Sequence, residues 1–534
     1  MARTSDSSSL DALQERIDRQ EVLLTERENE LATKQSIIDE QAERLSFLEE
    51  WNRLLRSQKF GSKSEKTPDE QGRLFNEAEV EALHAEESET VDVEVPAHTR
   101  QKAGRRPLPD FLPVREIRHD LADDEKVCAH DPNHTLVEIG CETSDQLEFI
   151  PARAQILRHI RPKYACATCK EGVKIAPMPK LPIPKSIATP ALLAHVVTSK
   201  YVDGLPLYRQ EKIFRRLGVD LSRATLASWM VKMGERVEPL MERIVQEIRH
   251  GGFVQSDETP FQVLKEPGKR AQSQSYLWAL RGGPAEHPLI YYEYDPSRSA
   301  EVPKRLLRGF KGYLQTDGYE GYTALGHEPG VIHVGCWAHT RRKFDEALRG
   351  QGKSKKKGAK VPAKQSKARQ ALSQIQTLYA IERSVKGASV EERYAARQER
   401  SRPVIEKLRR WLDASRDSVP PQSLTGKAMT YLDRQWPKLI RVLEDGRVPL
   451  DTNAVENTIR PFVLGRKNWL FADTVAGARA SANLYGLIET AKANGIEPWR
   501  YLRHLFEALP KIDSADQLEE LMPHRIDLER LSGD

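Results

Sequence analysis

The chain has 534 residues, of which 39% are hydrophobic and 30% are charged, and its mean hydropathy is −0.60. This length allows several folded domains, and no apolar stretch is long enough to predict a membrane span. The net charge of +5 shows that the chain as a whole is neither strongly acidic nor strongly basic. The charge is unevenly distributed, with an acidic segment at residues 69–94 and basic clusters elsewhere. Basic clusters of this kind favour a nucleic-acid partner.

The N-terminal region carries an apolar heptad repeat, which predicts a coiled-coil helix over residues 8–60. The repeat positions are Leu10, Ile17, Leu24, Leu31, Ile38 and Leu45. Such a stripe is buried only against another helix, so we expect a homo-oligomer, most simply a dimer. The alternative is one amphipathic helix that folds back on its own chain. The same region has no apolar core of the kind a secretory signal needs, so we expect a cytoplasmic protein.

Residues 66–100 are rich in acidic residues, Ala and Pro without periodicity, and we interpret them as an acidic linker. The next segment, residues 105–180, contains four of the five cysteines, too few for a disulfide framework. Cys166 and Cys169 have the spacing at which two thiolates bind one tetrahedral zinc ion. The alternative is a metal-free β-hairpin module with buried thiols.

Residues 186–245 have helical periodicity and predict a helix-turn-helix region. The first helix spans residues 209–217, and the second begins after the capping residue Ser222. Ile213, Leu217, Leu221, Leu226 and Trp229 are expected to face inward, and Arg223, Thr225, Ser228 and Lys232 outward. Helical hairpins of this kind also occur in proteins that do not bind DNA.

Strand-type segments then follow at residues 253–257, 276–280, 289–294, 312–316 and 331–335, separated by Gly- and Pro-containing turns. Asp257 lies on the first strand and Asp317 directly follows the fourth. Three hairpin-linked strands followed by αβ units are typical of the ribonuclease-H-like order, in which the first and fourth strands are neighbours. Two acids on these strands and one on a helix, Glu456, form a set of oxygen ligands suited to divalent cations.

Residues 346–445 have helical spacing and a lysine-rich loop at 350–358, which predicts an all-helical insertion between two core segments, 250–345 and 446–510. Residues 511–534 form a C-terminal tail. The predicted fold is therefore α/β: a ribonuclease-H-like mixed sheet core with an all-α insertion, preceded by the coiled coil, a small zinc-binding-like module and the helix-turn-helix region. The lysine loop is either solvated or in contact with flanking DNA phosphates.

Four motifs resemble the TnpC-type DDE transposases of the bacterial insertion-sequence sixty-six family. They are SDETPFQV around Asp257, LQTDGYEGY around Asp317, VGCWAHTRRKFDEAL from Val334, and the long stretch from Asp451 to Leu502 that begins DTNAVENTIRPFVLGRKNWLF. The resemblance implies that Asp257, Asp317 and Glu456 are the catalytic triad and bind Mg²⁺ or Mn²⁺. It also implies a zinc site formed by Cys128, His134, Cys166 and Cys169, with His130 as an alternative to His134.

Further residues near these motifs are expected to support the site or to contact DNA. They are Asn453, Arg460, Arg466, Lys467, Cys336, His339, Arg341, Arg342, Arg223 and Lys232. Asn453 and Arg460 share a helix face with Glu456. Cys336 and His339 also share a face, and packing is the alternative to a supporting role because a closed zinc site needs four ligands. Trp469 is either a base-stacking residue or part of the core.

The sequence therefore predicts a DNA transposase that cleaves and joins double-stranded DNA, both the ends of its element and a target. Accessory proteins of the same element are candidate partners, and no membrane partner is expected. Two alternatives are a ribonuclease-H-like nuclease without strand transfer and a domesticated DNA-binding regulator. The intact set of three acids argues against the regulator.

The zinc module leads to a direct test of metal content. The purified protein should contain about one zinc ion per chain, because one tetrahedral site binds one ion. Elemental analysis of the wild type and of a Cys166→Ser/Cys169→Ser variant measures this. Absence of zinc, or an unchanged zinc content in the variant, would reject the site.

Overall fold

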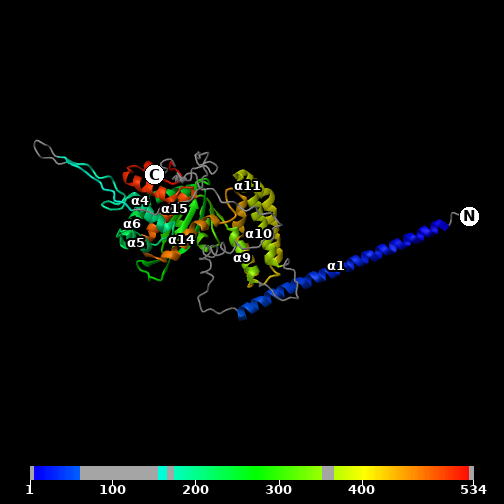
Figure 1. The fold of residues 1–534 in the computed structure, drawn as a ribbon. Coiled ribbons are helices and arrows are strands. Elements are labelled where there is room, and N and C mark those ends of the chain that lie inside the picture. Colours follow the sequence, from blue (N-terminus) through cyan, green and yellow to red (C-terminus); the bar gives the residue numbers. More distant parts are fainter. Residues whose placement is uncertain (1–4, 61–153, 165–173, 351–365, 528–534) are drawn as a thin grey trace, which may run out of the picture. The chain divides into compact units, whose positions relative to one another are not determined.

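The computed structural model describes residues 5–60, 154–164, 174–350 and 366–527 (Figure 1). The chain forms two compact units, one of residues 1–86, 177–215 and 220–534, and one of residues 87–176 and 216–219. In the second unit, strands β1 (Lys163–Tyr164) and β2 (Lys174–Ile175) form a small antiparallel pair. No helix among the described residues is both long and apolar enough to cross a membrane.

The N-terminal segment forms one continuous helix, α1 (Ser5–Phe60), as the heptad repeat predicts. Leu24, Leu31, Ile38 and Leu45 on its apolar stripe are all 56–65% exposed. These leucine and isoleucine side chains are therefore not buried by their own chain.

A mixed sheet forms the centre of the large unit, with strand order β5-β4-β3-β6-β7. The strands are β3 (Phe253–Lys265), β4 (Gln274–Gly282), β5 (Leu289–Asp295), β6 (Gly312–Gln315) and β7 (Val331–Val334). The first three are antiparallel, whereas β3–β6 and β6–β7 are parallel. All five strands lie where the sequence predicts them, and the first and fourth are neighbours.

A sixth strand, β8 (Ala472–Thr474), is not predicted from the sequence. It pairs in parallel with the far end of β3, where Val263 lies opposite Ala472. A three-residue strand is too short to produce a recognisable alternation, so only its partner defines it.

Two long helices, α14 (Asn453–Trp469) and α15 (Val475–Ala493), pack on the sheet. Phe462 of α14 meets Phe261 of β3 edge to face at 5.0 Å, and Tyr485 of α15 at 5.4 Å. Thr490 of α15 accepts a hydrogen bond from the backbone N–H of Ile290 at 3.0 Å. Aromatic packing and hydrogen bonds between side chains and backbone thus fix these helices against β3 and β5.

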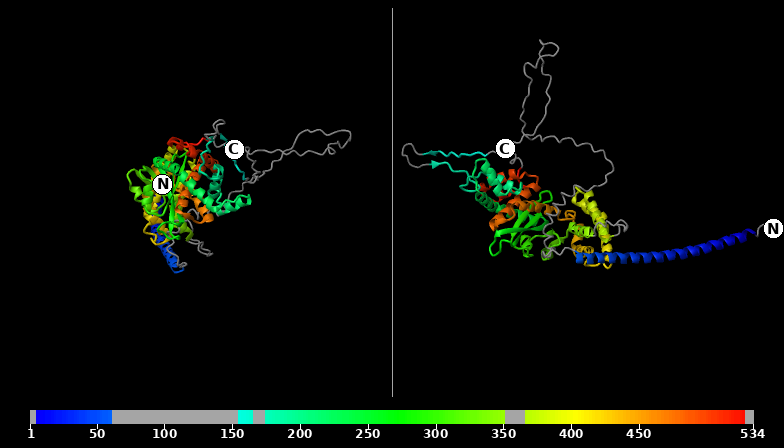
Figure 2. Two further views of the ribbon diagram at one scale, coloured as in Figure 1. Left: turned by 90° about the vertical axis from the view of Figure 1, so that its left-hand side faces the viewer. Right: turned by 60° about the horizontal axis from the view of Figure 1, so that its bottom comes forward.

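The remaining helices of the core surround this arrangement. They are α7 (Glu238–His250), α8 (Glu301–Leu306), α9 (Trp337–Gly350), α16 (Pro498–Ala508) and α17 (Ala515–Glu519). Between residues 366 and 445 the described regular elements are helical, as predicted: α10 (Lys367–Ser384), α11 (Val390–Ala396), a π-helical turn (Arg397–Ser401), α12 (Arg402–Ser415) and α13 (Leu424–Leu439). These helices, yellow to orange in Figure 2, share an apolar core that includes Ile375, Leu408 and Leu432. The lysine loop lies outside the described residues.

The predicted helix-turn-helix region contains α4 (Pro190–Tyr201), α5 (Leu207–Arg216) and α6 (Arg223–Arg236). The Ser222 hydroxyl caps α6 by accepting from the Thr225 N–H at 3.2 Å, as expected. One expectation is wrong, because Leu217 is 44% exposed and Phe214 is buried in its place. Helix α5 ends at Arg216, so Leu217 no longer follows the helical periodicity that would direct it inward.

Candidate active site

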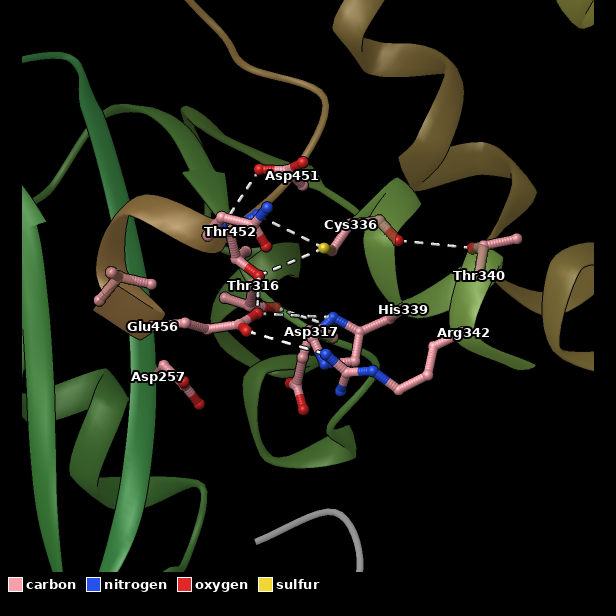
Figure 3. Close-up of polar contacts among 12 residues, drawn as sticks. Asp257, Thr316, Asp317, Cys336, His339, Thr340, Arg342, Asp451, Thr452 and Glu456 are labelled. Atoms are coloured by element: carbon pink, nitrogen blue, oxygen red, sulfur yellow. Dashed lines mark hydrogen bonds and ion pairs between the residues drawn. The ribbon is translucent and has the colours of Figure 1, made fainter. Parts of the chain in front are cut away.

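The register of two parallel strands places Asp257 and Asp317 at equivalent positions. Gln255 of β3 lies opposite Gln315 of β6, and each aspartate is two residues beyond its glutamine. Asp257 continues along β3, whereas Asp317 lies in the segment directly after β6. Neighbouring strands lie about 4.8 Å apart. The two carboxylates therefore project from adjacent chain segments at the same edge of the sheet (Figure 3).

The two glutamines also hold the start of the helix that carries Glu456. Gln255 Nε2 donates to Gln315 Oε1 at 2.8 Å and to the carbonyl of Asp451 at 3.0 Å. Gln255 Oε1 accepts from the backbone N–H of Val455 at 3.2 Å. The first N–H groups of a helix have no partner within the helix, and here a strand side chain supplies one. The residue next to Glu456 is thus bonded to the strand of Asp257.

Gln255 and Gln315 together form what we call the buried amide pair, and Gln315 makes further hydrogen bonds of its own. Its Nε2 donates to the carbonyls of Pro449 at 2.8 Å and Gly335 at 3.4 Å. Both side chains are at most 1% exposed, and these contacts use both donors of each amide. Buried amides need such pairing because an unsatisfied polar group costs about 1–3 kcal/mol. The amide pair therefore joins β3, β6 and the chain that leads into α14.

Glu456 is buried and lies among polar groups from α9 and from the N-cap of its own helix (Figure 3). The Thr452 hydroxyl donates to Glu456 Oε1 at 2.8 Å. His339 Nδ1 lies 3.9 Å from the same oxygen, and Arg342 Nη2 lies 4.0 Å from Oε2. Arg342, which the sequence presents as a residue that supports the site or contacts DNA, thus lies beside this carboxylate.

Glu258, the neighbour of Asp257, occupies the other face of β3. Its carboxylate pairs with Arg298 at 2.6 Å and accepts from the Tyr322 hydroxyl at 2.7 Å. The pKa of Glu258 is raised to about 7: burial is the largest cause and the nearby charge of Asp317 acts in the same direction, whereas Arg298 and Tyr322 oppose the shift. Negative charge is thus concentrated at this edge of the sheet. The carboxylates of Asp257, Asp317 and Glu456 are oxygen donors, which hard divalent cations prefer.

The helical insertion contributes groups that sequence reasoning did not identify. Lys438 of α13 lies close enough to Asp317 for the aspartate charge to raise its pKa, although burial is the larger effect and lowers the pKa of Lys438 overall. A Cβ placed on Gly318 would meet the Tyr431 hydroxyl at 2.7 Å, so α13 passes directly beside the Asp317 turn. No local motif marks either residue, because both contacts join segments far apart in the sequence.

The other predicted DNA contacts fall into distinct settings. Arg466 is half-buried and donates to the carbonyl of Pro260, so it binds β3, whereas Lys467 is exposed. Trp469 packs edge to face against Phe261 and Phe462, as a core residue does. Asn453 and Arg460 on α14 are half-buried; Arg223, Lys232 and Arg341 are exposed. The four predicted zinc ligands lie outside the described residues.

Family models match most of the chain. The model described as the IS66 family transposase matches residues 185–480, and the IS66 C-terminal element matches residues 486–524. The zinc-finger binding domain of IS66 transposases matches residues 125–170, which contain all four predicted zinc ligands. A model described as the homeodomain of the IS166 transposase C matches residues 48–117. This range includes the segment interpreted as a linker.

Similar proteins occur in Sinorhizobium fredii. The uncharacterized protein y4jD is 35% identical over 79% of this chain and 83% of its own length. The uncharacterized protein y4qI is 32% identical over 90% of this chain and 89% of its own length.

The buried amide pair yields a stability prediction. Gln315→Leu should destabilise the fold by about 2 kcal/mol, because the Pro449 and Gly335 carbonyls and the Gln255 amide lose buried partners, each at a cost of about 1–3 kcal/mol, with partial relaxation. Urea unfolding followed by tryptophan fluorescence measures the change. Gln262→Leu, on the neighbouring strand β3 and with an exposed hydrogen bond to the carbonyl of Ala271, should stay within about 0.5 kcal/mol of wild type. Equal effects of the two substitutions would contradict the assigned role.

Proposed function

The chain belongs to the IS66 transposase family, and we propose that it is a DNA transposase of an insertion sequence with Asp257, Asp317 and Glu456 as its catalytic triad. The observation that supports this proposal is the pairing of β3 with β6: Asp257 and Asp317 each follow by two residues the paired Gln255 and Gln315, and the buried Glu456 lies on α14 nearby (Figure 3). The strand order β5-β4-β3-β6-β7 and the helix that bears the third acid support a ribonuclease-H-like core at residues 250–345 and 446–510.

The triad is proposed to hold Mg²⁺ or Mn²⁺. Such ions, when bound, stabilise charge on the attacking and leaving oxygens of a phosphodiester. The protein groups around the triad keep the carboxylates in place: Asp317 Oδ1 accepts from the Tyr319 N–H at 2.8 Å, and Thr452 donates to Glu456. Because both carboxylates are held before substrate arrives, little reorganisation is needed during the reaction.

The proposed reaction consists of two phosphoryl transfers. Water attacks first and frees a 3′-hydroxyl at the element end, and this hydroxyl then attacks the target strand. No covalent protein intermediate is expected, since no Tyr or Ser motif of that kind accompanies the acids. Lys438 offers positive charge for the DNA backbone beside Asp317, and the exposed Lys467 offers it at the opposite end of α14 from Glu456.

DNA recognition is assigned to the elements before the core. The helix-turn-helix region of residues 186–245 presents Arg223 and Lys232 on the exposed side of α6. The zinc-binding module of residues 105–180 and the homeodomain-like segment add further DNA-binding surface. Two element ends are then brought together by pairing of the coiled-coil helices of residues 8–60, whose leucine and isoleucine stripe is exposed.

Substitution of the triad tests the catalytic assignment. Asp257→Asn, Asp317→Asn and Glu456→Gln each remove a charged ligand and preserve shape, so each should reduce Mg²⁺-dependent cleavage and joining by at least about 10³-fold. Binding to DNA that carries the element ends should persist. Cleavage and joining are measured on labelled end fragments in separate assays.

Two exposed acids serve as matched controls. Glu320, near Asp317, is 81% exposed at its side chain, and Asp473, beyond Glu456, forms an exposed pair with Lys265. Glu320→Gln and Asp473→Asn should retain near-normal activity. Glu258 is unsuitable as a control because its buried pair with Arg298 would be disrupted. Normal activity of Glu456→Gln would refute the triad, and cleavage without joining in the wild type would identify a nuclease.

The exposed stripe of α1 yields a test of oligomeric state. Removal of residues 1–58 should convert an oligomer into a monomer and leave the core folded, because the stripe is buried only against a second helix. Light scattering measures the mass, and circular dichroism monitors the fold. An unchanged number of chains per particle after truncation would exclude pairing through α1.

A further inference from the structure

A second group of metal-binding side chains lies directly behind Glu456. Cys336 ends the segment after β7, and His339 lies in the first turn of α9. One ligand atom from each of Cys336, His339 and Glu456 lies within 4.8 Å of the others, and all three residues are buried. The sequence showed two ligands three residues apart, and the fold supplies a third from α14.

The distances within this group are close to those between ligands of one ion. His339 Nδ1 lies 3.9 Å from Glu456 Oε1, whereas a direct hydrogen bond would need about 2.7–3.2 Å. A nitrogen and an oxygen that each bind one tetrahedral zinc ion at about 2.0–2.1 Å lie about 3.4 Å apart. The separation is therefore longer than a hydrogen bond, and a shift of about 0.5 Å would bring both atoms to the spacing of zinc ligands.

The sulfur of Cys336 is oriented as an acceptor. The backbone N–H of Thr452 points at Cys336 Sγ at 3.4 Å, and the Thr452 hydroxyl lies 3.2 Å from the same atom (Figure 3). The hydroxyl also lies 2.8 Å from Glu456 Oε1. Donors aimed at a sulfur and a carboxylate stabilise both as anions, which is the form in which they bind a metal.

We propose that Cys336, His339 and Glu456 form a site for one thiophilic divalent cation, of which Zn²⁺ is the best example. Three protein ligands leave a fourth tetrahedral position for water. Thiolate and imidazole select zinc over Mg²⁺, which takes oxygen ligands. Cys336, His339 and Glu456 are the only protein ligands that this site needs.

One consequence rests on the proposed function. Glu456 belongs to both ligand sets, so zinc in the second site withdraws a ligand from Mg²⁺ and inhibits DNA cleavage. Zn²⁺ and Mg²⁺ therefore compete for the carboxylate of Glu456.

Cobalt(II) is the probe for this site, because a thiolate bound to cobalt gives a charge-transfer absorption. Full-length protein is stripped of metal with a chelator and titrated with Co²⁺ in the absence of DNA and Mg²⁺. The zinc module also binds cobalt, so the signal of interest is the difference between wild type and Cys336→Ser. We expect the variant to bind about one Co²⁺ fewer per chain and to lose part of the absorption, because one site is removed.

Two further variants keep the sulfur in place and separate a binding defect from a folding defect. His339→Gln and Glu456→Gln should each weaken cobalt binding at this site by at least about tenfold. The Cys166→Ser/Cys169→Ser protein should retain the Cys336-dependent signal. Asp257→Asn should retain it as well, so loss of catalysis and loss of this site are distinguishable. Identical stoichiometry and absorption in wild type and Cys336→Ser would overturn the proposal.

Discussion

The arrangement of the acidic residues depends on the buried hydrogen bonds of Gln255 and Gln315. These amides are paired across β3 and β6 two residues before the two aspartates, and their remaining bonds include contacts with the chain just before Glu456. Burying two amides costs desolvation free energy, which complete hydrogen bonding offsets. A slip of one residue in any of the three segments would leave several of these groups without partners, so the amide pair selects one alignment.

The helical insertion is integrated with this centre at both of its ends. The backbone N–H of Gly335 donates to Lys438 at 3.1 Å, and that of Trp337 donates to Leu450 at 2.9 Å. The Trp337 indole donates to the carbonyl of Leu439 at 3.1 Å. The chain therefore leaves the core and returns to it at one place. The free energy of closing a loop depends only weakly on its length, so the length of the insertion has little influence on the strand order.

The sequence was sufficient to locate the five main strands, the long N-terminal helix and the helical character of the insertion, because periodicity and turn residues are local signals. The acids stood out through their motifs. Contacts between distant segments left no local signal: a glutamine in a strand is unremarkable until its partner is known, and neither Lys438 nor the third ligand beside Cys336 and His339 could be inferred from spacing. Leu217 was misassigned because the end of α5 was placed one residue too late, where periodicity gives the least information.

The strand β8 gives α14 a second attachment to β3. Gln255 holds the start of the helix, and beyond its end the chain reverses at Leu470, which has a φ of +64°, before Ala472 pairs with Val263. A left-handed leucine is strained, which indicates that the pairing is strong enough to maintain it. Helix α14 is therefore attached to β3 at its start and just beyond its end, which restrains it from sliding or tilting against that strand. For the proposed reaction, this double attachment means that the shape of the DNA, and not the position of α14, would change when the two meet.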